Sequence, residues 1–291
     1  MKLLILTPTL GANPLLRETV ASIAAVAALS GADKAENTVR HVIVTPAHAA
    51  AAVEKIAPAA QIVSERAGER RGGDGRGGDD SGGGGLYAAL NAGVDGMATA
   101  GVEWDALTWI NDDDRLCGPG FAQLLRKLKT SVGVGIAYGQ VGLIDGRGER
   151  IGRLPVAHCG EDLAPLLARG IVPLAQPGTV IRRAAWEKLG GLDASYRLAG
   201  DLAFFVRALV TGVRFTFADA EVAEFRLRAG QLSKQQEIGA REKARALALL
   251  NGVAPAVGAH WRFRWQNRGV YAERVRRHGF VSMEQLYSRT S

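Results

Sequence analysis

The chain has 291 residues, of which 47% are hydrophobic, and its formal net charge is +7. This length and apolar content allow a sizeable core, which excludes a chain that is disordered throughout. The two cysteines, Cys117 and Cys159, belong to no CxxC pair or Cys/His cluster, which argues against a disulfide framework or a zinc module and favours a reducing, cytoplasmic setting.

The amino-terminal residues MKLLILTPTL contain one lysine and a short apolar run that Thr7 and Pro8 interrupt. A secretory leader has a longer apolar stretch, so the pattern predicts a buried first strand. No window approaches the roughly 20 apolar residues of a membrane-spanning helix. We therefore expect a protein that is soluble or peripheral to a membrane.

Strand-like and helix-like segments alternate up to residue 110, which predicts βαβ units and an α/β fold. The strand-like segments are 3–6, 41–44, 61–64 and 105–110, and the helix-like segments are 15–29, 47–57 and 86–100. A glycine-rich stretch, 67–85, stands before the third helix, and nine of residues 72–85 are glycine. This composition predicts a flexible insertion.

The second half is more mixed. An Asp145-Gly146 pair between two β-prone runs predicts a hairpin, and helices are predicted at 183–191, 201–212 and 234–250. The pattern changes near residue 230. We therefore predict a main domain of residues 1–230 and a helical extension of residues 231–291.

Three consecutive aspartates, Asp112, Asp113 and Asp114, follow the strand-like segment 105–110. Adjacent carboxylates repel one another unless a cation or strong hydrogen bonds offset the repulsion, and Mg²⁺ or Mn²⁺ prefers such oxygens. The alternative is a solvated acidic turn that caps the next helix. No GxxxxGK[ST] or compact GxGxxG motif is present, which disfavours a P-loop or dinucleotide site.

Several motifs in order resemble the motif succession of glycosyltransferase family 2. They are TPTLGANPLLRETVASI, HVIV, GLYAALNAGV, WINDDDRL, AYGQVGLIDGRGE, GTVIRRAAWEKLGGLDASYRLAGDLAFFVRAL and EFRLRAGQLS, within residues 3 to 233. The resemblance implies a GT-A fold, with a Rossmann-like mixed sheet flanked by helices. It also implies inverting transfer of a sugar from a UDP-, GDP- or dTDP-sugar to a saccharide or lipid-linked acceptor, in polysaccharide or glycoconjugate biosynthesis.

The resemblance assigns roles to individual acids. Asp113 and Asp114 match the metal-binding acids, which implies a Mn²⁺ or Mg²⁺ cofactor, and Asp112 is a neighbouring candidate for the ribose. Asn111 stands where the family frequently has an acid. Asp201 matches the general base, with Gly200 in place of the usual preceding glutamate; its alternative role is a helix amino-terminal cap.

Other positions would contact the nucleotide sugar. Thr7, Pro8 and Thr9 match the first strand and loop of the nucleotide site, and Glu65 lies in a Ser-Glu-Arg sequence that resembles the family's Ser-Glu-Asp. Asn91 is predicted to contact the sugar donor. The alternative is that its side chain faces solvent in the middle of a helix. Arg228 replaces a common histidine; it cannot bind a metal but can bind the diphosphate.

The segment 260–278 is the basic part of the chain, with six arginines, one acid and four interleaved aromatic residues. The spacing suits an amphipathic helix at an anionic membrane surface. The alternative is a helix that packs its aromatic residues on the core and exposes its arginines. Nucleic-acid binding is disfavoured because no recognition motif accompanies the charge.

Two functions of different class follow. One is an active, metal-dependent glycosyltransferase, which the retained Asp113, Asp114 and Asp201 favour. The other is a GT-A-like nucleotide-binding or scaffold protein that has lost activity. Three departures from the family pattern favour this alternative. The second strand continues into Thr45-Pro46 where the family has a base-binding aspartate, Asn111 stands in place of an acid, and the common histidines are missing.

Overall fold

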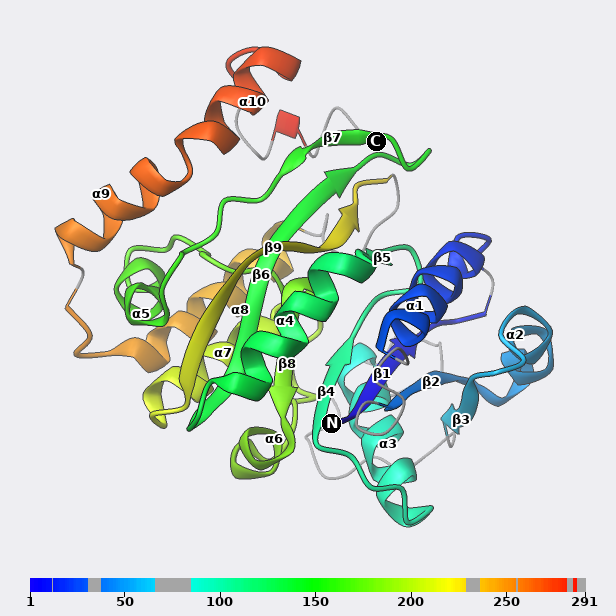
Figure 1. The fold of residues 1–291 in the computed structure, drawn as a ribbon. Helices are drawn as coiled ribbons and strands as arrows, with labels where there is room; N and C mark the ends of the chain where they lie inside the picture. Colours follow the sequence, from blue (N-terminus) through cyan, green and yellow to red (C-terminus); the bar gives the residue numbers. More distant parts are fainter. Residues whose placement is uncertain are drawn as a thin grey trace.

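A computed structural model describes residues 1–11, 13–30, 38–65, 85–228, 236–254, 256–281 and 285–286. Within them, a nine-stranded mixed sheet runs in the order β3-β2-β1-β4-β8-β6-β9-β5, with β7 paired to β6 (Figure 1). Its strands are β1 (Lys2–Pro8), β2 (Thr38–Pro46), β3 (Gln61–Glu65), β4 (Ala106–Trp109), β5 (Arg115–Leu116), β6 (Val134–Ile144), β7 (Arg150–Arg153), β8 (Thr179–Arg182) and β9 (Arg214–Arg226). The glycine-rich residues 67–84 lie outside the described residues.

Helices cover both faces of the sheet (Figure 1). They are α1 (Leu16–Ser30), α2 (Ala50–Ile56), α3 (Leu86–Thr99), α4 (Gly118–Thr130), α5 (Leu163–Leu167), α6 (Arg183–Leu189), α7 (Gly200–Val210), α8 (Gln236–Leu247), α9 (Val257–Gln266) and α10 (Arg268–His278). One core cluster joins β1 and β4 to α1 and α4, and the largest lies on the other face and includes residues of α3, α6 and α7.

The predicted βαβ units are present in the first half. Strands β1 and β2 are parallel neighbours, as are β1 and β4, and Leu6 pairs with both Val42 and Trp109. All three side chains are buried, because helices cover the apolar residues of these strands on both faces. The carboxyl ends of β1, β2, β3 and β4 therefore meet at one edge of the sheet.

The hairpin and the helix predicted at 183–191 are also present. Strands β6 and β7 are antiparallel, and Asp145 Oδ1 accepts hydrogen bonds from the N–H groups of Arg147 (2.8 Å) and Glu149 (2.9 Å) in the turn between them. Helix α6 ends at Gly190, whose φ of 68° is a left-handed conformation that glycine adopts without strain.

Helices α8 and α9 share the main core. Ala246 and Leu250, together with Ala259 and Phe263 of α9, belong to the same apolar cluster as residues of α3 and α7. The segment 260–278 forms two helices, α9 and α10, that meet at Asn267. No helix in the described part of the chain has the length and apolar character needed to cross a bilayer.

Candidate active site

The first part of the site lies where β1 and β4 end side by side. Thr9 Oγ1 donates a hydrogen bond to Asp112 Oδ2 (2.5 Å), and Asn13 Nδ2 donates one to Asp112 Oδ1 (2.8 Å). Burial raises the pKa of Asp112, and these two hydrogen bonds oppose the rise. Asp112 is therefore held at the edge of the sheet by residues of the loop that leads into α1. Sequence reasoning missed Asn13, which lies in the matched loop motif GANP.

Asp114 faces the protein interior. Its side chain is fully buried, Oδ1 accepts the N–H of Arg226 (2.8 Å), and Oδ2 accepts Asn111 Nδ2 (3.3 Å). Burial and the nearby charge of Asp113 raise the pKa of Asp114 well above its usual value. Arg226, the last residue of β9, thus holds one carboxylate oxygen of Asp114, and Asn111 binds the other.

Asp113 is the acid that meets a side-chain cation. Arg228 Nε lies 2.7 Å from Asp113 Oδ2, and the backbone oxygen of Asp113 accepts a hydrogen bond from Arg226 Nε (2.7 Å). Arg226 is fully buried and also pairs with Glu18 of α1 (2.5 Å). Sequence reasoning missed Arg226, although the alternation of arginines in FRLR at the end of a strand was a detectable pattern.

The residues present suit a divalent cation at one position. Mg²⁺ and Mn²⁺ prefer oxygen ligands, and Asp112 and Asp113 supply carboxylates just after β4. Asp113 and Asp114 are both buried, and both carboxylate oxygens of Asp114 already accept hydrogen bonds from Arg226 and Asn111. Asp113 Oδ2 is engaged by Arg228, so a cation at that oxygen requires the guanidinium to move away. We therefore regard Asp113 as the candidate ligand, with Arg228 as its competitor.

The second part of the site is the start of α7, which the chain topology brings to the same edge. Helix α3 begins at the carboxyl edge, after β3, and leads back to the start of β4. The loop before α7 follows α3 toward that edge: Asn91 bonds both backbone groups of Leu192 (2.8 and 3.0 Å), and Tyr87 donates to the oxygen of Leu198 (2.8 Å). Asp201 thus lies at the edge where β4 ends.

Asp201 has the environment of a proton acceptor. Its Oδ1 accepts the N–H of Leu202 (2.8 Å) and lies 3.5 Å from the hydroxyl oxygen of Tyr87. The pKa of Asp201 is raised to about 6, and burial is the largest cause. The charge of Glu242 also raises this pKa, whereas hydrogen bonds to the carboxylate lower it. The residue is partly exposed, and a pKa of about 6 leaves it mainly a carboxylate at neutral pH.

Gly200 and Tyr87 explain the missing glutamate before Asp201. A Cβ atom at position 200 would lie 2.5 to 2.8 Å from ring atoms of Tyr87, which is buried. A glutamate there would therefore collide with the ring. Tyr87 occupies the space that a second acid would need.

Glu242 of α8 holds the loop that leads to Asp201. Its carboxylate accepts hydrogen bonds from three successive backbone N–H groups, those of Arg197 (2.8 Å), Leu198 (2.8 Å) and Ala199 (2.9 Å). Ala199 is the cap residue of α7, so one of these bonds satisfies the N–H at the start of the helix, and the other two hold the loop that precedes it. Sequence reasoning missed this residue, and nothing in its local sequence distinguishes it from other surface glutamates.

The remaining predicted contacts lie at or near the same edge. Thr7 is buried, and its Oγ1 is 3.0 Å from His41 Nε2; Pro8 is partly exposed at the end of β1. Burial lowers the pKa of His41 to about 4, so this histidine is neutral. Glu65 ends β3, but its side chain lies outside the described part of the chain. Asn91 uses its amide to hold Leu192 instead of facing solvent.

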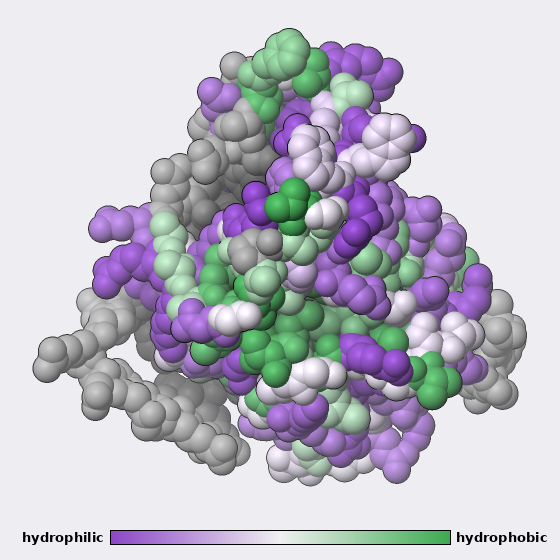
Figure 2. Space-filling view, turned by 90° about the vertical axis from the view of Figure 1, so that its left-hand side faces the viewer, coloured by the Kyte–Doolittle hydropathy of each residue, from purple (hydrophilic) through white to green (hydrophobic). Residues whose placement is uncertain are grey.

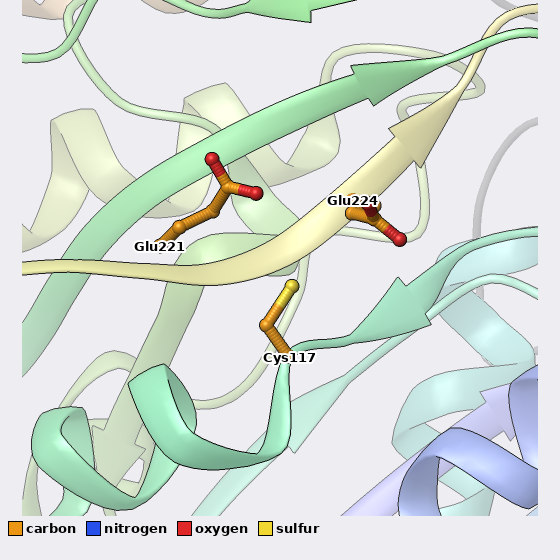
Figure 3. Close-up of side chains that lie close together, drawn as sticks. All are labelled: Cys117, Glu221 and Glu224. Atoms are coloured by element: carbon orange, nitrogen blue, oxygen red, sulfur yellow. The ribbon is translucent and has the colours of Figure 1, made fainter. Parts of the chain in front are cut away.

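A separate cluster lies between α4 and β9. Figure 3 shows Cys117 Sγ directed between Glu221 and Glu224, and among the described residues these are the only three ligand groups of this kind within 4.8 Å of one another. Arg150 pairs with Glu221 (2.6 Å), and Arg115 pairs with Glu224 (2.9 Å). Burial and the two glutamates raise the pKa of Cys117 to about 12. The arginines neutralise the carboxylates and the thiol stays protonated, so we assign no metal here.

No model of a known protein family matches the sequence, and no curated protein matches it. Solved structures are similar. Residues 1–349 of TarS from S. aureus, in complex with UDP-GlcNAc, are 15% identical over 100% of this chain and 79% of that chain, with a TM-score of 0.57. The mannosyltransferase PcManGT from Pyrobaculum calidifontis, in complex with GDP-Man and Mn²⁺, is 17% identical over 99% and 78%, with a TM-score of 0.57.

A third structure, glucosyl-3-phosphoglycerate synthase from Mycobacterium tuberculosis in complex with Mn²⁺, UDP and phosphoglyceric acid, is 15% identical over 88% and 80%, with a TM-score of 0.50. At these identities the similarity shows the fold alone. It confirms the predicted architecture, a mixed α/β sheet flanked by helices as in the GT-A glycosyltransferases.

Proposed function

We propose that this protein transfers a sugar from a nucleotide diphosphate sugar to an acceptor hydroxyl. The observation that carries the proposal is the convergence of Asp112 and Asp113 with Asp201 at one edge of a GT-A sheet. The first pair supplies carboxylates beside the candidate nucleotide site, and Asp201 supplies a base with a pKa of about 6. Glycosyl transfer by displacement needs both groups.

The donor is proposed to be a UDP-, GDP- or dTDP-sugar. Structural neighbours were solved with UDP-GlcNAc, with GDP-Man or with UDP, which supports a nucleotide sugar without choosing the base. The nucleotide would lie over the ends of β1 and β4, where Pro8, Thr9, Asn111 and Asp112 are placed. Asp112 retains acceptor capacity for a ribose hydroxyl, since each carboxylate oxygen can accept more than one hydrogen bond.

In the proposed reaction, Asp201 accepts the proton of the acceptor hydroxyl while that oxygen forms a bond to the anomeric carbon of the donor. The bond between this carbon and the diphosphate oxygen breaks, and its electron pair leaves with the nucleotide diphosphate. Attack from the face opposite the leaving group inverts the anomeric configuration, as the resemblance to family 2 implies. A Mn²⁺ or Mg²⁺ ion held by Asp113 would neutralise the diphosphate. Arg228, released from Asp113, can bind the same phosphates.

A second candidate function is nucleotide binding without turnover. The observation that favours it is the ion pair between Arg228 and Asp113, because a fixed guanidinium at this oxygen excludes a metal ligand bond. Such a protein would bind nucleotide through Arg228 and Asp112, and binding would not depend on metal.

Calorimetric titration of UDP, GDP and dTDP with and without Mn²⁺ distinguishes these functions. The variant is Asp113→Asn, because replacing the buried Asp114 would also remove the acceptor for Arg226 N–H. Asp95→Asn, an exposed change on α3, is the control. We expect one nucleotide to bind with Mn²⁺ and to lose at least about tenfold in affinity in Asp113→Asn. Nucleotide affinity that is the same with and without Mn²⁺, and the same in Asp113→Asn, would favour the second function. If no nucleotide binds, both proposed functions are contradicted.

A further inference from the structure

Helix α9 is fixed to the protein through one face. Ala259 and Phe263 are buried in the main core, and the buried Asn267 follows the helix. Asn267 accepts the N–H of Val156 (2.9 Å) through Oδ1 and donates to the oxygen of Val156 (2.9 Å) through Nδ2. Arg262 also pairs with Asp162 ahead of α5. The orientation of α9 is therefore determined, and its opposite face is held outward.

That outward face carries two tryptophans. The exposed fractions of Trp261 and Trp265 are 66% and 68%, and Arg264 and Arg268 are also exposed. Trp261, Arg264 and Trp265 follow the spacing i, i+3 and i+4, which places them on one side of α9, and Arg268, the first residue of α10, joins them through its contact with Trp265. We call them the tryptophan–arginine face. The guanidinium carbon of Arg268 lies 4.2 Å from the ring centre of Trp265.

The surroundings of this face are cationic. The single acid of the segment, Glu273, is paired with Arg153 (3.1 Å) and Arg277 (3.2 Å). Among the described residues, no ion pair involves Arg264, Arg268 or Arg276. Figure 2 shows the side of the molecule that includes α9 and α10, where pale and green side chains stand among purple ones in the upper part of the view. The face thus combines exposed aromatic surface with uncompensated positive charge.

We propose that the tryptophan–arginine face docks on an anionic lipid bilayer surface. Tryptophan is favoured at the membrane interface because its ring is apolar and its N–H can be hydrated, and arginine pairs with lipid phosphates. Helix α9 has a buried face for the protein and an aromatic, basic face for the membrane, as interfacial helices do. This inference concerns location and does not depend on the proposed transferase activity.

The position of the face relates it to the candidate active site. Helix α10 packs on β7, which pairs with the last residues of β6. Strands β6 and β9 are parallel, and β9 ends at Arg226, beside Asp113 and Asp114. Docking through α9 would therefore hold α10, which packs beside the end of β6, near the bilayer, and a lipid-linked acceptor would be found at the same surface.

Co-sedimentation with lipid vesicles tests the inference. The vesicles contain phosphatidylcholine alone or phosphatidylcholine mixed with phosphatidylglycerol, and the variants are Trp261→Ala/Trp265→Ala and the control Arg126→Ala/Arg169→Ala, which removes two exposed arginines elsewhere. We expect binding to the anionic vesicles, at least about tenfold weaker binding to the neutral ones, and a loss of about tenfold or more in the tryptophan variant only.

Tryptophan fluorescence gives a second readout, because Trp104, Trp109 and Trp186 are buried and the emission shift on docking would come from Trp261 and Trp265. Thermal melting of the tryptophan variant shows that it is folded. Absence of binding to anionic vesicles, or equal binding by the tryptophan variant, would overturn the inference. Binding to a single-stranded oligonucleotide in place of vesicles would also overturn it, by identifying a nucleic acid as the partner.

Discussion

Two carboxylates of the candidate active site, Asp113 and Asp201, have opposite surroundings. Asp113 meets a guanidinium at 2.7 Å, whereas Asp201 meets no described cation and lies near the acid Glu242 and the hydroxyl of Tyr87. Asp113 is buried beside this guanidinium, whereas Asp201 has no described cation beside it and desolvation raises its pKa to about 6. This difference is the basis for proposing that Asp113 interacts with cations and that Asp201 accepts a proton.

The largest expected effect comes from Asp201→Asn. If Asp201 is the base, turnover of the nucleotide sugar should fall by about 10³-fold, within the usual range for loss of a general base, and nucleotide affinity should be unchanged. The wild-type kcat/KM should rise with pH and level off above about 6, the pKa of Asp201. Steady-state kinetics over pH, with calorimetry for binding, measure both.

Stability separates this role from a simple helix cap. The folded-state pKa of Asp201 is raised to about 6, so its ionisation disfavours the folded state as pH rises from about 4 to 6. Asn keeps an acceptor for Leu202 N–H and carries no charge, so Asp201→Asn should be more stable than wild type by about 1–3 kcal/mol at neutral pH. A destabilised variant with normal turnover would show that Asp201 only stabilises the first turn of α7.

The second effect concerns Arg228 and the metal. Arg228→Ala frees Asp113 Oδ2 from its guanidinium partner, so the affinity for Mn²⁺ should rise by about tenfold, while nucleotide binding without metal should weaken. Titration of free Mn²⁺ by electron paramagnetic resonance measures the change. Arg147→Ala, an exposed change in the hairpin turn, is the control. Equal Mn²⁺ affinity in both variants would mean that Arg228 does not compete with a metal.

A third change, Glu242→Gln, tests how Asp201 is positioned. The carboxylate of Glu242 accepts three backbone N–H groups, so we expect a loss of about 1–3 kcal/mol in the free energy of unfolding and about tenfold in kcat. The negative charge of Glu242 raises the pKa of Asp201, so the acidic limb of kcat/KM should move to lower pH. The control Glu237→Gln, on the same helix, should change neither the free energy of unfolding nor the kinetics. If the acidic limb of kcat/KM stays at the same pH in Glu242→Gln, Glu242 has only a structural role.

Much of the fold follows from local sequence patterns. Apolar runs such as LLIL and HVIV gave β1 and β2, because strands buried on both faces need no polar alternation. The run of aspartates after β4 indicated the edge of the sheet where the candidate site lies. Partners distant in the chain were not predictable: Arg226 and Glu242 reach the site only through the order of the strands and the packing of α8.

The helices of the segment 260–278 show the same limit. The sequence allowed either an interfacial helix or aromatic residues packed on the core. In the structure Phe263 packs on the core, as the second alternative predicts, while Trp261 and Trp265 face outward, and the interfacial role stays a prediction. The burial of Ala259 and Phe263, the Arg262–Asp162 pair and the contacts of Asn267 with Val156 fix which side of α9 is buried. Contacts with residues distant in the chain, and not the helical periodicity, determine which side of α9 is buried.

The smallest expected effect is that of Tyr87→Phe, which leaves the ring that fills the space beside Gly200. The variant loses one hydrogen bond to the oxygen of Leu198 and the weaker contact with Asp201, so the free energy of unfolding should fall by only about 1 kcal/mol. Because the hydroxyl of Tyr87 lowers the pKa of Asp201, its removal should move the acidic limb of kcat/KM to higher pH, opposite to Glu242→Gln. Opposite shifts in the two variants would identify Asp201 as the titrating base, whereas a limb that ignores both changes would assign it to another group.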